Sequence, residues 1–286
     1  MIELLQFEFM QRAFVVATVT GALCAVIGVY IVLRGMSFIG AGVAHASFGG
    51  VALGFFTGLN PFFTAVLFCT AVAWGIGLVS ESNRLREDTA VGIFFASTMA
   101  LGVLLIGSLK GYTIDLFGYM FGNVLAVTVF DMWAAIILSV IVFGTIILLF
   151  KEFFFLTFDS EAARVAGLPV RFLNYLMLTL IAVTIVMSIK AVGIVLVSAL
   201  LVAPAAAAHQ LTDDFKKMML LSVLIGVAST WIGLFLSSWF DIASGATIVL
   251  TATIVFFVCS AFSPNRRSAR RRMLALRKNV NREAKS

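Results

Sequence analysis

One ionisable side chain, His45, falls well inside a predicted membrane-spanning segment of this sequence. It lies in the stretch 34–54, RGMSFIGAGVAHASFGGVALG, which is apolar enough to cross a membrane. Imidazole binds zinc and other first-row cations, and an ionisable group at membrane depth is costly enough to indicate a functional site. Two interpretations stay open: a metal ligand in a transport pathway, or a neutral histidine that is hydrogen-bonded to a backbone carbonyl.

Aspartates in segments predicted to face the outside are a second set of candidate ligands. They are Asp115, Asp131 and Asp241, and their carboxylates would attract cations weakly. We single out Asp115 and Asp241 as candidate metal-contacting residues at the outer mouth of a pathway. Capping of the last predicted span is the alternative role of Asp241, and its position just before that span favours capping.

The longest loop predicted on the inner side, residues 157–171 (TFDSEAARVAGLPVR), has the pattern of a short helix. Asp159 or Ser160 can cap its start, and Glu161 suits its first turn. Gly167 can end it in a left-handed conformation, and the proline two residues later prevents its continuation. We expect a compact amphipathic helix that seats in a groove on a soluble partner, with a bare surface loop as the alternative.

Membrane-spanning helices must position these candidate residues. Of 286 residues, 62% are hydrophobic and 12% are charged, whereas a soluble domain has about 25% charged residues. Because a span needs about 20 apolar residues, we predict an all-α polytopic membrane protein of about eight to nine transmembrane helices, with one domain over residues 1–262. The apolar runs are 12–33, 37–58, 61–80, 90–109, 132–150, 171–189, 191–211, 218–239 and 245–262.

Two segments do not fit plain spans. Residues 1–11 are predicted to form a short interfacial helix with its apolar side chains on one face. Residues 110–131 contain glycines, aromatic residues and two aspartates, so we predict one or two short helices at the outer mouth.

Small residues lie four apart in the second predicted span, at Gly42, Ala46, Gly50 and Gly54. Such a stripe lets helix backbones approach closely in a membrane, where no hydrophobic drive brings helices together. We therefore expect these four to be helix-packing residues on the helix that carries His45.

Lys and Arg set the predicted orientation. With the C-terminus in the cytoplasm, all but three of the 20 Lys and Arg face inside, the exceptions being Arg12, Lys110 and Lys190. This agrees with the positive-inside rule and predicts a multi-pass protein of the cytoplasmic membrane with a basic cytoplasmic tail, residues 263–286. Because such juxtamembrane segments typically bind anionic head groups, we expect membrane lipids, and not nucleic acid, as the partner of the tail.

Missing motifs exclude several functions. The sequence has no GxxxxGK[ST] phosphate loop, so it cannot bind ATP in that way, and it has no HExxH or GxSxG motif. Its three cysteines, Cys24, Cys69 and Cys259, lie in predicted spans without CxxC spacing, which does not support a disulfide framework or a soft-metal cage. We expect a transport subunit rather than an enzyme, with no cofactor of its own.

Four segments of the chain resemble one family, the permease subunits of ATP-binding-cassette (ABC) importers for zinc, manganese or iron(II). Residues 34–54 are similar to the family's RGMSLIGDALSHAVLPGVALG, and residues 196–212 (LVSALLVAPAAAAHQLT) are similar to its LVSALLVIPAATARLLT. Residues 241–250 (DIASGATIVL) resemble DLPSGATIVL, and residues 120–127 (MFGNVLAV) resemble LFGDILAV. The likeness extends to about residue 262 and leaves out only the basic tail.

The resemblance implies a type II ABC importer permease-like bundle that pairs with a second copy, as a homodimer, to enclose the pathway. Two cytoplasmic ATPase subunits would bind ATP, and an extracytoplasmic solute-binding protein would deliver a divalent metal ion. Glu161, Ala162, Ala163 and Gly167 match the family's EAA…G loop, which docks on the ATPase, with Asp159 at the start of its helix. This match favours docking over a bare loop.

The chain departs from the family at residues near the pathway. Where the family commonly has an aspartate four residues before the histidine, this chain has Ala41, and Ala44 replaces the serine that precedes the histidine. The aspartate of LFGD is Asn123. Because manganese prefers oxygen ligands and zinc accepts imidazole readily, these losses favour zinc, with manganese and iron as alternatives. A pathway that binds metal poorly, with selectivity left to the solute-binding protein, also stays open.

Two other functions fit the sequence less well. A siderophore or cobalamin permease would use the same machinery, but such chains are typically longer and have ten spans. A stand-alone secondary transporter usually has an ionisable relay or a broken-helix site at mid-membrane, whereas this chain offers one histidine.

Overall fold

Long helices make up most of the chain. The computed structural model describes residues 7–83, 86–109, 116–122, 124 and 127–263, so the basic tail lies almost wholly outside the described residues. Within those residues, nine helices are long and apolar enough to span a membrane. They are α1 (Glu8–Leu33), α2 (Ile39–Thr57), α3 (Pro61–Asn83), α4 (Glu87–Ser108), α6 (Val129–Leu148), α9 (Val170–Val192), α10 (Ile194–Leu211), α11 (Phe215–Phe240) and α12 (Ser244–Phe262).

The chain is a multi-pass membrane protein, and the residues that the structure describes have the all-α fold and the number of apolar helices predicted from its apolar runs. The predicted interfacial helix is wrong for residues 8–11, because α1 already begins at Glu8. Its first turn continues the hydrogen-bonded ladder of the span, so nothing separates the two. In the segment 110–131, the short helix α5 (Leu116–Phe121) is present, and α6 begins at Val129, three residues earlier than predicted.

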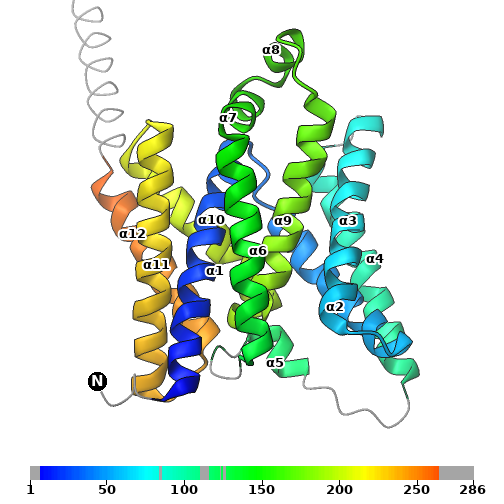
Figure 1. The fold of residues 1–286 in the computed structure, drawn as a ribbon, viewed down its shortest axis with the longest axis vertical. Coiled ribbons are helices and arrows are strands. Elements are labelled where there is room, and N and C mark those ends of the chain that lie inside the picture. Colours follow the sequence, from blue (N-terminus) through cyan, green and yellow to red (C-terminus); the bar gives the residue numbers. More distant parts are fainter. Residues whose placement is uncertain (1–6, 84–85, 110–115, 123, 125–126, 264–286) are drawn as a thin grey trace, which may run out of the picture.

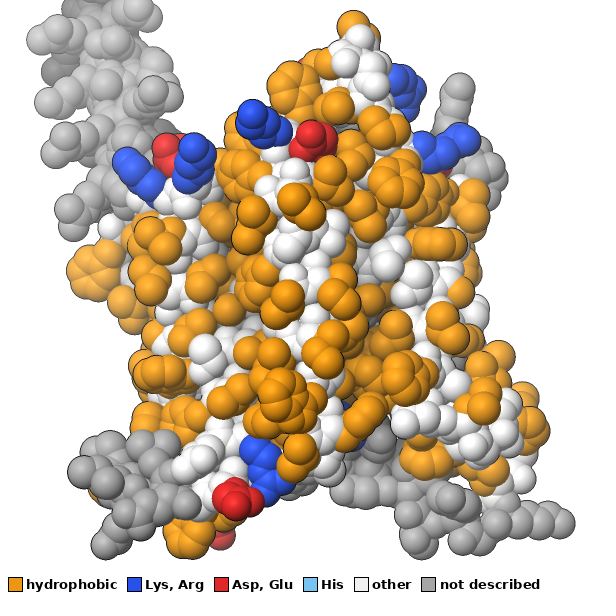
Figure 2. Space-filling model, in the orientation of Figure 1, with side chains coloured by type: hydrophobic (Ala, Val, Ile, Leu, Met, Phe, Trp, Pro, Cys, Tyr) orange, Lys and Arg blue, Asp and Glu red, His pale blue; other side chains and the backbone are white. Residues whose placement is uncertain are grey.

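The two ends of the bundle differ (Figure 1). The short helices α7 (Phe150–Phe158) and α8 (Ser160–Val165) project at one end, where α12 also finishes. The start of α1 and the helix α5 lie at the opposite end. We call these the α8 end and the α5 end. Apolar side chains cover the face shown in Figure 2, while charged ones gather toward the two ends, as expected for a membrane-spanning bundle.

The spans pack in two groups around α9. On one side α2 packs against α3 and α4, and on the other α1 packs against α10 and α11, with α12 covering α10 and α11. Helix α9 contacts both α1 and α3. The largest fully buried side chains come mainly from α1 and α9, such as Tyr30, Ile27, Ile181 and Ile185. These two helices therefore form the centre of the subunit.

A single residue, Gly193, separates α9 from α10. Its φ of 93° lies in the range that only glycine adopts readily. A side chain there would collide with the backbone of Phe121, the last residue of α5, and of Gly122. Glycine is therefore required at this junction both by conformation and by space.

Candidate functional site

His45 lies on α2 with its ring partly buried. Its Nδ1 is 2.9 Å from the carbonyl oxygen of Ala41. Because a carbonyl oxygen only accepts hydrogen bonds, Nδ1 donates, and Nε2 of the neutral ring keeps its lone pair. The ring also packs on Phe95 of α4, with 4.5 Å between ring centroids. The contact expected of a structural histidine is thus present, and it leaves Nε2 in the form that ligates metals in many proteins.

A hollow of about 460 Å³ adjoins this part of α2. Ala41 and Gly42 line it from α2, and Val91, Gly92 and Phe95 line it from α4. An aspartate at position 41 would place a carboxylate in this hollow, but the alanine leaves only Asp88 as an acidic lining residue. Across the described residues, no group of three or more His, Cys, Asp or Glu side chains could hold a metal ion. The described part of one chain therefore offers the His45 imidazole without a complete set of metal ligands.

The two candidate ligands at the outer mouth have different outcomes. Asp115 lies outside the described residues. Asp241 is exposed and does not cap the last span, so that prediction is wrong: Ala243 precedes α12 and makes no side-chain cap. Asp241 instead ends α11 in the left-handed conformation, with φ 54°. Aspartate is one of the few residues other than glycine that visit this conformation routinely, which explains its place there.

The predicted short helix in the segment 157–171 is present as α8. Oδ1 of Asp159 accepts hydrogen bonds from the backbone N–H groups of Glu161, at 3.1 Å, and Ala162, at 2.8 Å. Gly167 ends the helix with φ 81°, and Ala163 anchors it with no exposed surface. Val165 is 90% exposed at the tip. The helix is therefore capped at both ends and presents an apolar tip away from the bundle.

Aromatic rings connect the base of this projection to the bundle. Phe215, the first residue of α11, packs against Phe154 and Phe158 of α7 with centroid distances of 5.1 and 6.1 Å. It also meets Tyr30 of α1 at 5.7 Å. Since α7 leads directly into α8, these edge-to-face ring contacts join the base of α8 to the bundle.

The small-residue stripe of α2 meets two different helices. A Cβ at Gly42 would lie 2.6 Å from the Val91 side chain of α4. At Gly50 and Gly54 it would lie 2.8 and 2.7 Å from backbone Cα atoms of α3. Ala46 between them is fully buried. The stripe thus brings α2 close to a side chain near the α8 end and to backbone near the α5 end.

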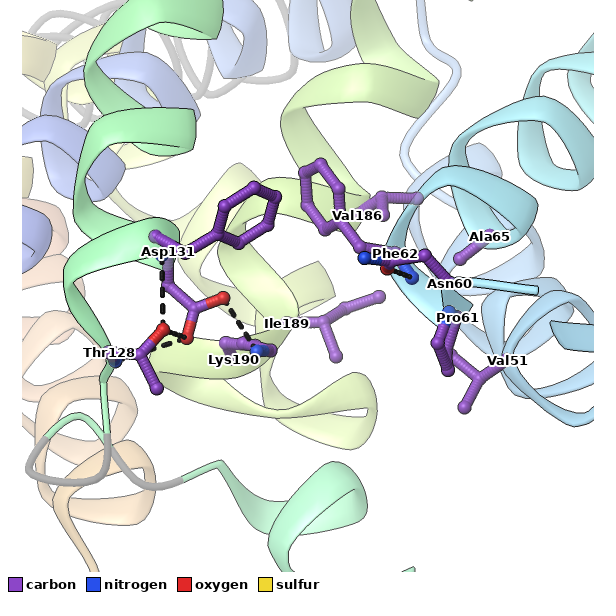
Figure 3. Close-up of a pocket in the computed structure, with 11 residues that line it drawn as sticks. Val51, Asn60, Pro61, Phe62, Ala65, Thr128, Asp131, Val186, Ile189 and Lys190 are labelled. Carbon is purple, nitrogen blue, oxygen red and sulfur yellow. Dashed lines mark hydrogen bonds and ion pairs between the residues drawn. The ribbon is translucent and has the colours of Figure 1, made fainter. Parts of the chain in front are cut away.

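Sequence reasoning missed an ion pair at the α5 end. Lys190 Nζ, near the end of α9, is 2.6 Å from Oδ1 of Asp131 on α6, whose side chain is 7% exposed. Oδ2 of Asp131 also accepts from the backbone N–H and the hydroxyl of Thr128, in a capping box. Figure 3 shows this pair on one wall of a cavity of about 140 Å³, with Asn60 and Pro61 at the start of α3 opposite. The Thr-x-x-Asp spacing was the available signal for the cap.

A looser polar network lies at the α8 end. Arg34, just after α1, donates to Asn174 Oδ1 at 2.7 Å, and the Asn174 amide donates to Glu81 at 3.1 Å. Arg171 is 4.0 Å from the same carboxylate. Burial lowers the pKa of the Arg34 guanidinium, while the charge of Glu87 opposes that shift. Nη1 of Arg34 is buried and makes no hydrogen bond within the described part of the chain.

Comparison with known proteins decides the family. Residues 6–263 match the family described as "ABC 3 transport family". The chain belongs to the ABC 3 transport family. It is 43% identical over 261 residues to "Manganese transport system membrane protein MntC" of Listeria monocytogenes, covering 91% of this chain and 93% of that protein. It is 37% identical over 267 residues to "Probable iron transport system membrane protein" of Haemophilus influenzae, covering 92% and 97%.

The fold of this ABC 3 family member also matches a solved structure. The chain aligns with a chain of "PsaBC from Streptococcus pneumoniae in complex with Fab" with a TM-score of 0.84 and 37% identity, over 93% of this chain and 96% of that one. The resemblance drawn from the four sequence motifs and the predicted permease bundle are both confirmed.

Proposed function

We propose that this chain is the membrane permease of an ATP-driven importer of divalent metal ions, and that its metal is manganese. The identity to the manganese permease of Listeria monocytogenes, over nine-tenths of both chains, carries the proposal. The absence of catalytic motifs and of a phosphate loop in the sequence fits a transport subunit whose ATP is hydrolysed by a separate chain.

The proposed metal is manganese, whereas the sequence favoured zinc because Ala41 stands where the family commonly has an aspartate. Whole-chain similarity to a manganese permease weighs more than one missing carboxylate, and iron remains the second candidate because of the Haemophilus influenzae relative. Manganese prefers oxygen ligands, so His45 would act as a transient contact through Nε2. Other ligands would come from outside this subunit, and Asp115 and Asp241 would attract cations at the outer mouth.

Partners follow from the two ends of the bundle. Helix α8 would seat on a cytoplasmic ATPase dimer through its apolar tip. The docking segment runs from Asp159 to Gly167 and includes Glu161, Ala162 and Ala163. In this arrangement the α8 end would face the cytoplasm. The α5 end would then face an extracytoplasmic solute-binding protein. A second copy of this chain would complete the pathway as a homodimer, and the basic tail beyond residue 263 would lie on anionic lipids of the inner leaflet.

Metal uptake in proteoliposomes tests the proposal. We expect the complete transporter, with its ATPase and binding protein, to import manganese in an ATP-dependent way and to prefer it over zinc. His45→Ala should lower uptake by about tenfold or more, the effect of losing one metal contact or its orienting partner. His209→Ala, at the exposed end of α10, is the matched control because it removes the other histidine of the chain. Equal uptake of zinc and manganese would contradict manganese as the preferred metal. Uptake at the wild-type level by His45→Ala would contradict the role of His45 as a metal contact.

A further inference from the structure

A hollow with two arginines in its lining lies between α3 and α9 at the α8 end. It has a volume of about 830 Å³ and opens to the surface. Two arginines, Arg164 on α8 and Arg171 on α9, line it, and its other lining residues are mainly aromatic and aliphatic. The side chains that matter here are Arg164, Arg171, Phe172, Tyr175, Trp74 and Thr179.

We propose that this groove binds one anionic phospholipid of the inner leaflet, with its phosphate between the two guanidinium groups. Arg164 is exposed, and no described carboxylate pairs with it. Arg171 has an 85% exposed side chain and only a long contact of 4.0 Å with Glu81. The two arginines outnumber this one acid, so the edge of the groove carries a net positive charge that an anionic head group complements.

The depth of the groove fits a lipid better than a free anion. Thr179 lies eight residues beyond Arg171 on α9, which is about 12 Å along the helix axis. At that depth Nε1 of Trp74 donates to Thr179 Oγ1 at 2.9 Å, so the indole is held in place by its polar edge. Trp74 also packs edge-to-face on Tyr175, with 6.0 Å between centroids. A bound inorganic anion would need only the arginines, whereas this fixed apolar wall matches an acyl chain.

The position of the aromatic residues supports the same occupant. Trp74 is 46% exposed and Phe172 is 63% exposed, although both belong to spans. Trp and Tyr are enriched at membrane interfaces, where one part of the ring is apolar and another is polar. Arginine next to such rings can hold a phosphate bidentately. The groove therefore combines a charged head-group site with an apolar slot that runs toward the membrane centre.

Fluorescence quenching by brominated lipid tests this site directly and needs no transport. The other tryptophans of this chain, Trp133, Trp231 and Trp239, and those of its partner subunits are replaced by phenylalanine, so Trp74 alone emits. The transporter complex is placed in vesicles of phosphatidylcholine with a minor fraction of phosphatidylglycerol, and either one lipid or the other carries bromine in its acyl chains. At equal bromine content, we expect Trp74 to contact phosphatidylglycerol about ten- to thirtyfold more than random mixing predicts, since each arginine favours an anionic lipid by about one kcal/mol.

Charge variants make the test specific. Arg164→Gln with Arg171→Gln should remove the excess quenching, and Arg164→Gln alone, on an exposed position, should remove part of it. Lys216→Gln with Lys217→Gln removes the same charge at the same end of the bundle, on the exposed first turn of α11, and should leave the quenching unchanged. Inorganic phosphate added to the wild type should not displace the lipid.

Several outcomes would overturn the proposal. Equal quenching by the two brominated lipids would show no anionic site, as would excess quenching that survives loss of both arginines. An equal loss of excess quenching in the lysine variant would show that the positive charge of the whole end, and not this groove, attracts the lipid. Displacement by phosphate would make the occupant a free anion. Shielding of Trp74 from both lipids would mean that a second copy or the ATPase fills the groove.

Discussion

The two ends of the bundle are held together in different ways. At the α5 end, Asp131 and Lys190 form a 2.6 Å ion pair in which the carboxylate is almost fully buried and has a second set of partners. At the α8 end, the link between Arg171 and Glu81 spans 4.0 Å, and both side chains reach water. Exposed pairs of that kind contribute about 0–1 kcal/mol to the free energy of unfolding. Removing one partner of a buried pair lowers the free energy of unfolding by about 3–5 kcal/mol.

Close backbone contacts are a second feature of the α5 end. Gly50 and Gly54 of α2 lie against backbone of α3, and Gly193 lies against backbone at the end of α5. The turn glycines do not divide in the same way: a Cβ at Gly35 or Gly167, toward the α8 end, would meet no atom within 4 Å, and neither would one at Gly58, between α2 and α3. Close backbone contact at the α5 end is therefore a property of its helix contacts and not of its turns.

The largest effect is expected from Asp131→Ala. It leaves the Lys190 ammonium without its partner and removes the capping box of α6, so we expect a loss of about 2–3 kcal/mol, below the usual ~3–5 because Lys190 is partly solvated. Thermal unfolding of the purified protein measures this loss. The double variant Asp131→Ala/Lys190→Met should recover part of it, and additive losses in the two would contradict a tight pair.

Gly50→Ala tests close backbone packing at the α5 end. The added methyl group would lie 2.8 Å from Cα of Ala65, so α2 and α3 must move apart, and we expect a loss of about 1–3 kcal/mol. Gly92→Ala is the matched control on α4, where a Cβ meets no atom within 4 Å. It should instead gain about 0.5–1 kcal/mol from helix propensity. If both substitutions changed the free energy of unfolding in the same direction, close packing at Gly50 would not be what distinguishes it from Gly92.

Asp159→Ala tests the order of α8 itself. Loss of the two cap hydrogen bonds should cost the helix about 1 kcal/mol while leaving global unfolding unchanged. Hydrogen exchange at the amides of Ala162 and Ala163 should become about fivefold faster, since exchange follows the free energy of local opening. Ser160→Ala, next to the cap, should leave these rates unchanged. Unchanged exchange in Asp159→Ala would mean that the bundle, and not the cap, orders α8.

The smallest effect is expected from Glu81→Gln. Its pair with Arg171 is long and solvated, so its removal should change the free energy of unfolding by less than about 0.5 kcal/mol. Denaturant titration measures the free energy of unfolding of Glu81→Gln and of Asp131→Asn, which removes one negative charge at the other end. A larger loss for Glu81→Gln would reverse the comparison between the two ends.

The sequence predicted what depends on local pattern. Apolar runs located the spans to within a few residues, because membrane-spanning backbone must be helical, and the cap and left-handed glycine of α8 were readable from Asp159 and Gly167. The pairing of Asp131 with Lys190 was not predictable, since 59 positions separate them and only the packing of α6 on α9 brings them together. Asp241 was misplaced because one aspartate suits the end of one helix as well as the start of the next.

The one-residue junction at Gly193 has a mechanical consequence. Consecutive Cα atoms are about 3.8 Å apart, so α9 cannot slide along its axis without pulling or pushing α10. Four residues separate α8 from the start of α9, and α10 carries Pro204 within its length. A displacement of α9 along its axis would therefore be passed to α10, because the junction at Gly193 has no slack chain to absorb it.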